Sequence, residues 1–247
     1  MGRLDQALVV RGLCESRERA KRAIMAGRVK VNQQTARKPS DSIQPQDQLI
    51  LATPEKFVSR GGLKLEHALD HFGLEVGGLT AIDLGASTGG FTDCLLQRGA
   101  AKVYAVDVGQ GQLAWKLRRD PRVLVMEKIN ARHLTLAAFG PPFSGADLIV
   151  IDCSFISLRK ILPPAVALLG ASGKLVALIK PQFEAGKTEA DKGSGVIRDA
   201  AIHQRVLRDV QGFVEALPGL RWHGVTESPI LGPAGNKEFL ALIEKVG

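Results

Sequence analysis

The amino-acid sequence predicts an α/β protein, in which a mostly parallel seven-stranded sheet follows a small N-terminal α+β unit. From residue 79 onward, apolar runs of strand length alternate with helical patterns, which is typical of βαβ units in a Rossmann-like sheet. A glycine-rich turn directly after the first run supports the same fold class. The strands are expected at 80–84, 102–107, 122–126, 147–151, 174–179, 221–226 and 238–243. Helices are expected at 63–72, 91–96 and 200–217.

The N-terminal unit is predicted from two short helices followed by two strands. Apolar residues between Leu4 and Val9 have helical spacing, and the glycine at position 12 ends this helix. Ser16 is placed to cap a second helix, 16–26, which stops at the next glycine. Alternating patterns predict strands at 28–32 and 47–51. We therefore expect one domain at 1–52, a linker at 53–60 and a second domain at 61–247.

The charge balance favours a polyanionic partner. The chain has 33 Lys and Arg against 25 Asp and Glu, which gives a net charge of +8. Basic residues crowd into the first 38 positions rather than spreading evenly. This distribution favours nucleic acid over an acidic membrane surface as the partner.

Cysteine usage and hydropathy bear on the location of the protein. The three cysteines form no C-x-x-C pair, which is typical of reduced thiols in a cytoplasmic protein. The N-terminus has no apolar signal-peptide core, and the longest apolar runs, such as 148–151 and 175–179, are far too short to span a bilayer. We expect a cytoplasmic protein that does not act in a membrane.

The residues from Asp83 to Phe91, D-L-G-A-S-T-G-G-F, form the glycine-rich turn between a predicted strand and a predicted helix. Such a turn lets the backbone approach a nucleotide-like ligand closely. Its spacing, G-x-x-x-G-G, is neither the dinucleotide G-x-G-x-x-G nor a Walker lysine loop. Asp107 ends the next strand, 22 residues after Gly85, where an acid can hold ribose hydroxyls. We expect a nucleoside ligand without a pyrophosphate, S-adenosylmethionine (SAM) above all; an ordinary strand-to-helix turn is the alternative.

Two further predicted strands each end in a charged residue. Asp152 ends the strand at 147–151, and Lys180 ends the strand at 174–179. Open α/β sheets bind their ligands at the carboxyl edge of the strands, which is where both side chains are expected. Either charge alone could simply reach solvent. Two of them on adjacent strands beside the glycine-rich turn favour a site.

The first 32 residues resemble the S4 RNA-binding domain. The pattern R-L-D-x-x-L-V-x-R-G-L-x-x-S-R-x-x-A-x-x-x-I-x-x-G-x-V-x-V-N runs from Arg3 to Asn32. Gln33 departs from the pattern, because many such domains have glycine in this hairpin turn. The resemblance implies contact with structured RNA through basic side chains, here Arg3, Arg11, Arg17, Arg19, Lys21, Arg28 and Lys30. A solvated basic helix face without a ligand is the alternative.

The rest of the chain resembles the FtsJ-type ribose methyltransferases, and the whole chain resembles the TlyA family, which joins an S4 domain to an FtsJ-type domain. The matching stretches are S-R-G-G-L-K-L at 59–65, the turn at 83–92, I-K-P-Q-F-E at 179–184 and G-N-K-E-F at 235–239. The FtsJ tetrad Lys-Asp-Lys-Glu falls on Lys64, Asp152, Lys180 and Glu238. The implied SAM-binding residues are Asp83, Gly85, Ala86, Ser87, Gly89, Gly90, Phe91, Asp107 and Asn130. Many FtsJ enzymes have Asp in place of Asn130.

The resemblance implies SAM-dependent methylation of a cytidine ribose in 16S and 23S rRNA within ribosomal subunits. A ribose 2′-hydroxyl is a poor nucleophile at neutral pH, so its proton must be leaving as it attacks. Lys180 could stabilise the alkoxide as an ammonium or accept the proton itself. Asp152 would orient Lys180, and Glu238 would hold the lysines.

Other patterns point elsewhere and are weaker. The run 152–155, D-C-S-F, lacks both prolines of the [DN]-P-P-[FY] loop of amino-group methyltransferases. Cys153 lacks the preceding proline of pyrimidine C5 nucleophiles, which favours a structural thiol. His67 and His71 have metal-like i, i+4 spacing without an evident third ligand, so no metal is expected. A non-catalytic ribosome-assembly factor and a haemolysin, a label that this family carries, remain as alternative functions.

Overall fold

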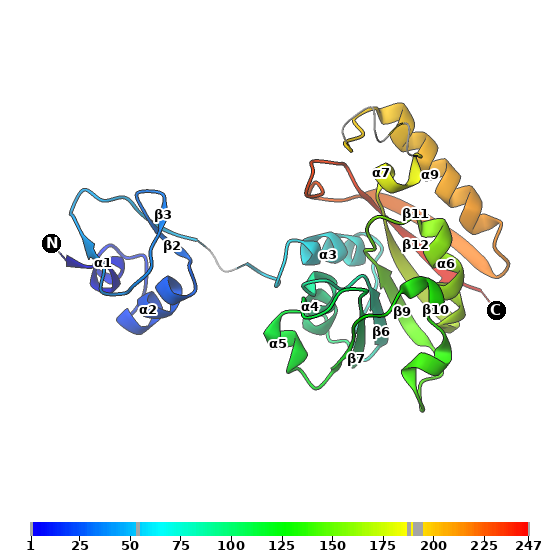
Figure 1. The fold of residues 1–247 in the computed structure, drawn as a ribbon, viewed down its shortest axis with the longest axis horizontal. Coiled ribbons are helices and arrows are strands. Elements are labelled where there is room, and N and C mark those ends of the chain that lie inside the picture. The colour runs from blue at the N-terminus through cyan, green and yellow to red at the C-terminus, as the bar shows by residue number, and fades with distance from the viewer. Residues whose placement is uncertain (1, 53–54, 187–188, 190–194, 247) are drawn as a thin grey trace. The chain divides into compact units, whose positions relative to one another are not determined.

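The structure is a computed structural model that describes residues 2–52, 55–186, 189 and 195–246. The chain divides into two compact units, Met1–Lys56 and Phe57–Gly247, each of which is described by itself (Figure 1). Phe57 was expected in the linker, but only 4% of its surface is exposed and it lies in the core of the second unit. Its ring occupies the space above Gly62, where a Cβ atom would overlap it.

The first unit packs two helices on small antiparallel sheets. The helices are α1 (Leu4–Val10) and α2 (Arg17–Met25), and Ser16 Oγ caps α2 by accepting a hydrogen bond from the backbone N–H of Arg19 at 3.3 Å. β2 (Val29–Val31) pairs with both β3 (Gln34–Thr35) and β5 (Leu49–Leu51). A shorter pair joins β1 (Gly2–Arg3) to β4 (Ser42–Ile43).

The structure shows the type of turn between β2 and β3, where Gln33 stands in place of the glycine of many S4 domains. Asn32 and Gln33 both have positive φ angles, 50° and 69°. Two consecutive left-handed residues are characteristic of a type I′ turn, whose twist matches that of the flanking strands. Gln33 therefore adopts a left-handed conformation at a steric cost that glycine would not incur.

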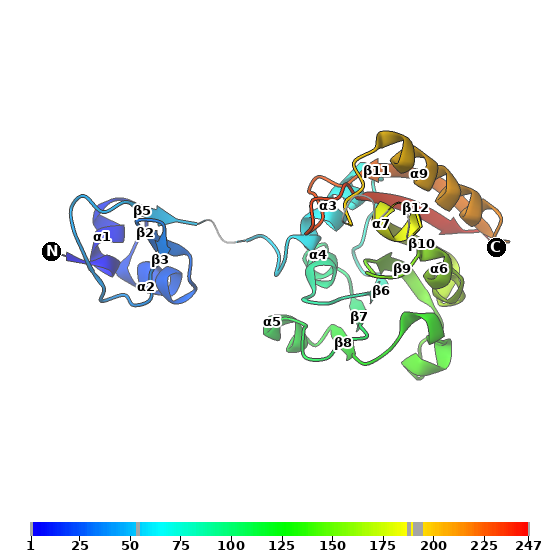
Figure 2. The same ribbon diagram turned by 45° about the horizontal axis from the view of Figure 1, so that its top comes forward.

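The second unit is built on the predicted seven-stranded sheet, in the order β11-β12-β10-β9-β6-β7-β8 (Figures 1 and 2). Neighbouring strands from β10 to β8 are parallel, whereas β12 runs antiparallel to β10 and to β11. The bounds are β6 Thr80–Leu84, β7 Lys102–Val106, β8 Val123–Met126, β9 Ala146–Ile151, β10 Leu169–Ile179, β11 Leu220–Glu227 and β12 Phe239–Lys245. The prediction of a mostly parallel sheet is confirmed.

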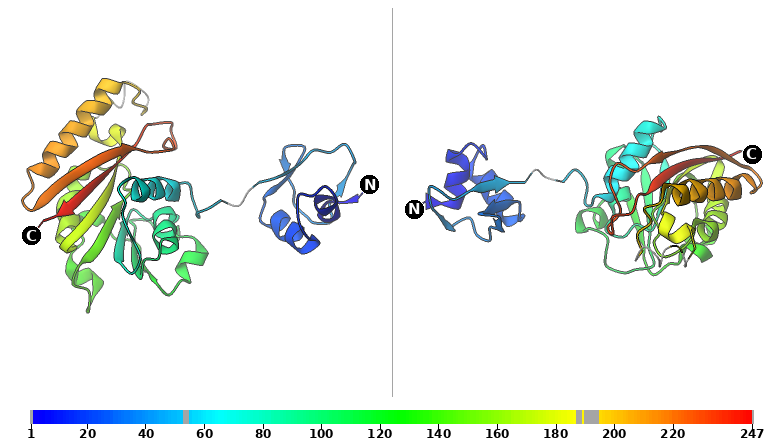
Figure 3. Two further views of the ribbon diagram at one scale, coloured as in Figure 1. Left: turned by 180° about the vertical axis from the view of Figure 1, so that it is seen from behind. Right: turned by 90° about the horizontal axis from the view of Figure 1, so that it is seen from above.

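Helices cover both faces of this sheet (Figure 3). Side chains of α3 (Gly61–His71) and α4 (Gly90–Gln97) share one core with Ala81, Val103 and Val150. Side chains of α6 (Leu158–Ala167) and α9 (Ala200–Glu215) share the other core with Ile82 and Ile149. Alternate residues of each strand thus enter opposite cores, as the period of two in a strand requires.

The structure contains helices that the sequence did not predict, and one strand is longer than predicted. α6 contains Pro163 and Pro164, and prolines normally interrupt helices because they lack the N–H donor. β10 begins at Leu169, five residues before the predicted 174, and its pairing with β9 shifts register between Leu169 and Lys174. The short helical segments α5 (Trp115–Arg118), η1 (Ala131–His133), η2 (Leu136–Phe139) and α7 (Pro181–Glu184) are too brief for periodicity to reveal.

Candidate active site

The glycine-rich turn links β6 to α4 through three left-handed residues, Gly85, Ser87 and Gly89. Gly85 has φ +88° and Gly89 has φ +97°, a region that only glycine enters freely. A Cβ atom on Gly85 would lie 2.7 Å from the carbonyl oxygen of Asp152, and one on Gly89 would overlap Leu117. One on Gly90 would overlap Ser59 Oγ. These glycines therefore let the turn press against the neighbouring loop, α5 and the start of α3.

Asp83 and Phe91 support the turn from within. Asp83 is fully buried, and its Oδ2 accepts hydrogen bonds from the backbone N–H of Thr92 at 2.9 Å and from Thr92 Oγ1 at 2.7 Å. Its other oxygen has no hydrogen-bond partner among the described residues. Burial, and after it the nearby carboxylate of Asp152, raise the pKa of Asp83 to about 7. Phe91 is 3% exposed and packs in the core of the unit.

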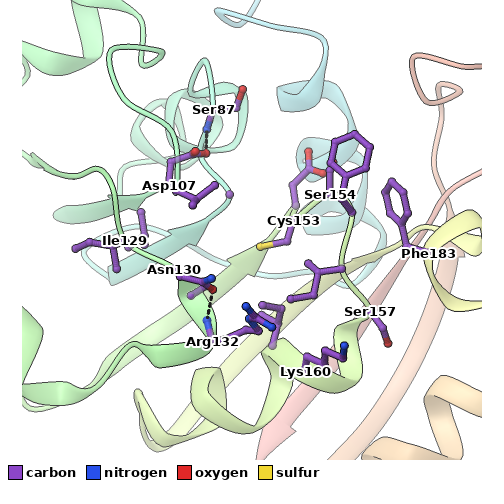
Figure 4. Close-up of a pocket in the computed structure, with 18 of the residues that line it drawn as sticks. Ser87, Asp107, Ile129, Asn130, Arg132, Cys153, Ser154, Ser157, Lys160 and Phe183 are labelled. Carbon is purple, nitrogen blue, oxygen red and sulfur yellow. Dashed lines mark hydrogen bonds between the residues drawn. The ribbon is translucent and has the colours of Figure 1, made fainter.

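A cavity of about 770 Å³ opens at the carboxyl edge of the sheet (Figure 4). Asp107, Ile129 and Asn130 lie on one side of it, and Ser154, Ser157 and Phe183 lie on the other. Its volume is in the range of small-molecule sites. It has the acid, the amide and the apolar wall that a ribose and an adenine would require.

Asp107 is oriented by backbone hydrogen bonds. Its Oδ2 accepts from the N–H of Ser87 and its Oδ1 from the N–H of Gly109, both at 2.7 Å. Each carboxylate oxygen has a further lone pair, so both can still accept from ribose hydroxyls. The Asn130 side chain accepts from the N–H of Arg132 at 3.1 Å, which leaves its NH₂ group for a ligand.

A second cavity, of about 310 Å³, adjoins the first and shares Gly85, Ser87, Asp152 and Ser154 with it. Ala86 and Phe91 of the glycine-rich turn also line this cavity. All four predicted tetrad residues line it, each from a different part of the fold. They come from α3, from the ends of β9 and β10, and from the residue before β12, and they are Lys64, Asp152, Lys180 and Glu238.

The tetrad is arranged as two lysine–carboxylate pairs. Lys64 Nζ lies 2.5 Å from Glu238 Oε2, and the two side chains are 8% and 1% exposed. Lys180 Nζ lies 2.6 Å from Asp152 Oδ1, with exposures of 8% and 23%. Gly232 makes room for Glu238, because a Cβ atom there would overlap its carboxylate. Asp152 lines both cavities, so it stands at the point where a donor and an acceptor would meet.

Ser154 is a site residue that the sequence reasoning missed. Its Oγ accepts a hydrogen bond from Lys180 Nζ at 2.7 Å, and it lines both cavities. No pattern singles it out in the sequence beyond its position two residues after Asp152.

The thiol alternative loses support, and one of the two histidines lies next to a threonine of β11. Burial, and after it the carboxylate of Asp152, raise the pKa of Cys153 to about 12, which disfavours the thiolate that a nucleophile needs. His67 Nε2 lies 3.0 Å from Thr226 Oγ1. Within the part of the chain that the structure describes, no three His, Cys, Asp or Glu side chains are grouped to hold a metal ion.

The predicted RNA-contacting residues fall into groups with different environments. Arg3 and Arg17 pair with Asp5, which is fully buried, and hydrogen bonds, from Arg3 above all, lower the pKa of Asp5 to about 2. Arg11 donates to the carbonyl oxygens of residues 44, 45 and 47 at 2.5 to 3.1 Å.

The remaining four basic side chains have exposed ion-pair partners or none among the described residues. Arg19 pairs with Glu15 and Lys21 with Glu18, each at 2.8 Å on exposed surface. Arg28 and Lys30 have no side-chain hydrogen bond or ion pair with any described residue. The positive charges of these two side chains are therefore not paired with any described residue of the protein.

Comparison with known protein families assigns both units. A model of FtsJ-like methyltransferases matches residues 57–245, and a model of the S4 domain matches residues 2–49. The chain belongs to the FtsJ-like methyltransferase family. Its fold and its enzyme class are therefore those that the sequence predicted.

Similar proteins align with almost the whole length of this FtsJ-like chain. It is 51% identical to "Putative rRNA methyltransferase YqxC" of Bacillus subtilis, over 96% of this chain and 84% of that protein. It is 45% identical to "16S/23S rRNA (cytidine-2'-O)-methyltransferase TlyA" of Mycobacterium tuberculosis, over 96% and 87%. "Hemolysin A" of Brachyspira hyodysenteriae is 42% identical, over 97% and 98%.

Solved structures agree on the fold. A "Putative hemolysin from Streptococcus thermophilus" superposes with a TM-score of 0.74 at 47% identity, over 99% of this chain and 88% of that one. A "putative S-adenosylmethionine dependent methyltransferase from Listeria monocytogenes" superposes with a TM-score of 0.54 at 16% identity, over 76% of this chain and 100% of that one, which shows a shared fold. None of the described helices of this FtsJ-like chain is both long and apolar enough to cross a membrane.

Proposed function

We propose that this protein is a SAM-dependent rRNA 2′-O-methyltransferase that acts on cytidine ribose in 16S and 23S rRNA. One observation carries the proposal: two lysine–carboxylate pairs, one buried and one partly buried, line a small cavity that adjoins a nucleoside-sized cavity. The names of the relatives from Bacillus subtilis and Mycobacterium tuberculosis support the same reaction. Because its substrate is ribosomal RNA, the protein would act in the cytoplasm.

The larger cavity fits SAM. Asp107 has free lone pairs for the ribose hydroxyls, and Asn130 has a free NH₂ group for the adenine. Ile129 and Val108 line the same cavity and offer an apolar surface to the adenine ring. When bound, SAM supplies an electrophilic methyl group on a sulfonium.

The tetrad would prepare the acceptor hydroxyl. Lys180 offers an N–H to the 2′-oxygen and stabilises negative charge that develops there. Asp152 holds Lys180 through Oδ1, and its Oδ2 can accept the proton that the hydroxyl loses. Glu238 pairs with Lys64, which lines the same cavity and adds a second cation to it. Holding acceptor and donor in line adds to this effect.

The N-terminal domain would bring the RNA to this site. We assign RNA binding to residues 1–52 and methyl transfer to residues 61–247. Arg28 and Lys30 are the first candidates for phosphate contacts, because neither is used inside the domain. Arg19 and Lys21 can exchange their exposed ion pairs for phosphates at little cost.

The test is methyl transfer from labelled SAM to 30S subunits, 50S subunits and naked rRNA, with ribose methylation mapped on the products. Lys180→Ala should lower kcat about 100-fold or more. Lys174→Ala, in the middle of β10 and paired in register with Glu244, is the matched control and should keep full activity, because Lys174 lines neither cavity. A wild-type protein that transfers no methyl group to any of these RNAs would contradict the proposal. SAM binding in calorimetry separates a true loss of catalysis from a misfolded protein.

A further inference from the structure

We propose that Ser154 is a positioning residue. It orients the Lys180 ammonium toward the acceptor hydroxyl, which attacks the methyl group of SAM. The inference rests on the methyl-transfer function proposed above and extends it to a residue outside the tetrad. Three features of the structure support it: the polar contacts of the Lys180 ammonium, the backbone after Ser154 and the attachment of the loop that carries Ser154.

The Lys180 ammonium contacts two neighbours, one through a hydrogen bond and the other through an ion pair. An ammonium has three N–H donors. Ser154 Oγ accepts one of them at 2.7 Å, and Asp152 Oδ1 forms an ion pair with the same ammonium at 2.6 Å, so an N–H remains for an acceptor oxygen in the smaller cavity. A hydrogen bond to one side chain and an ion pair with another restrict where the remaining N–H points, whereas the ion pair alone lets the ammonium rotate. Lys64 has only Glu238 as a side-chain partner among the described residues, so it lacks this constraint.

The backbone after Ser154 is held in a conformation that its sequence does not favour. Phe155 has φ +63°, which is an outlier for a bulky residue. Its side chain is 91% exposed and touches the ring of Phe183 at a centroid distance of 5.3 Å. Core packing of Phe155 therefore does not explain the strained turn. The turn leaves Ser154 Oγ within reach of Lys180, and strain of this kind concentrates at functional sites.

The loop is also fixed from its far end. Glu184 follows Lys180 through α7, and its Oε2 accepts from Ser157 Oγ at 2.7 Å. Its Oε1 accepts from the backbone N–H of Leu158, also at 2.7 Å. The loop after β9 and the segment after β10 are thus tied together at both ends, through Ser154–Lys180 and Ser157–Glu184. Such a frame holds Ser154 in place rather than letting it follow the substrate.

A serine suits this position because its hydroxyl is a neutral acceptor. A second carboxylate beside Lys180 would add negative charge where an alkoxide must form, and would raise the barrier. The hydroxyl instead directs the ammonium while leaving the local charge unchanged.

The test compares Ser154→Ala, which removes the hydroxyl, with Ser154→Thr, which keeps it. Ser172→Ala, at an exposed serine in β10, is the matched control. Ser154→Ala should lower kcat about 10-fold, equivalent to about 1.4 kcal/mol. KM for rRNA and the calorimetric Kd for SAM should stay within about twofold, and Ser154→Thr should recover most of kcat.

The outcomes separate this inference from the function on which it rests. Absence of methyl transfer by the wild-type protein contradicts the proposed function. With an active wild type, an unchanged kcat in Ser154→Ala contradicts the positioning role alone. A raised KM for rRNA at unchanged kcat would also overturn it, because Ser154 would then contact the substrate directly. A lowered melting temperature that Ser154→Thr does not restore would indicate a structural role instead.

Discussion

The buried Lys64–Glu238 pair allows stability and catalysis to be separated experimentally. Lys64→Met leaves the Glu238 carboxylate without its cation at a position where the side chain is 1% exposed. Glu238→Leu leaves the ammonium of Lys64 without its carboxylate, at a position where the side chain is 8% exposed. Replacing both residues removes both charges and leaves apolar side chains of similar volume in their place.

The magnitude follows from burial. Removing one partner of a buried ion pair costs about 3–5 kcal/mol, whereas replacing the whole pair by apolar residues is often neutral or stabilising. With a urea m-value of about 2 kcal/mol/M, each single variant should lose about 2 M in its unfolding midpoint. The double variant should return to within about 1 kcal/mol of wild type. Its methyl transfer should remain as low as that of the single variants.

Tryptophan fluorescence is a suitable assay, because it reports the second unit alone. Trp115 and Trp222 both lie in this unit, and residues 1–56 contain neither Trp nor Tyr. Urea unfolding of the two single variants and the double variant completes a double-mutant cycle with the wild type. A coupling energy of about 5 kcal/mol or more is expected, because two single losses of about 3–5 kcal/mol are set against a double variant within about 1 kcal/mol of wild type. Single-variant losses below about 1 kcal/mol, or a double variant no more stable than the singles, would refute the burial argument.

Three further predictions concern the turn, its acid and the RNA-binding domain. Gly85→Ala should lose about 2–4 kcal/mol in urea unfolding, because its Cβ atom would lie 2.7 Å from the carbonyl oxygen of Asp152 at φ +88°. In the folded protein the pKa of Asp83 is raised to about 7, so the folded state holds its proton more tightly than the unfolded state. The free energy of unfolding of the wild type should therefore fall as pH rises from about 4 to 7. Melting curves recorded across this pH range should show that Asp83→Asn abolishes the decline. Arg11→Ala should loosen the loop at 44–47 in hydrogen exchange. Arg28→Ala should instead weaken rRNA binding and lower its salt dependence by about one counterion.

Each of these predictions has its own control or contradiction. Gly77→Ala, where a Cβ atom would meet nothing within 4 Å, should change stability by no more than about 0.5 kcal/mol. Equal melting differences between wild type and Asp83→Asn at every pH would contradict the buried-acid argument. The RNA argument fails if Arg28→Ala and Arg11→Ala weaken rRNA binding equally, or if Arg28→Ala destabilises the domain.

The sequence by itself determined most of the fold. Strands and helices leave a local period, and the apolar runs at 80–84 and 102–107 agree with β6 and β7 to within one residue. Local chemistry also placed the cap at Ser16 and the glycines of the turn. Where local chemistry misleads, as with the prolines inside α6, prediction from sequence fails because tertiary packing overrides propensity.

Only the tertiary structure decided which side chains act together. The sequence supplied the residue types of the tetrad through a family resemblance, but Lys64 meets Glu238 across 174 positions, and Lys180 meets Ser154 across 26. The tertiary structure also decided that Arg11 supports a loop, while Arg28 has no side-chain partner among the described residues. The physical reason is that periodicity reports which face a residue occupies. Pairing across elements depends on strand order, loop conformation and burial, and none of these leaves a local pattern in the chain.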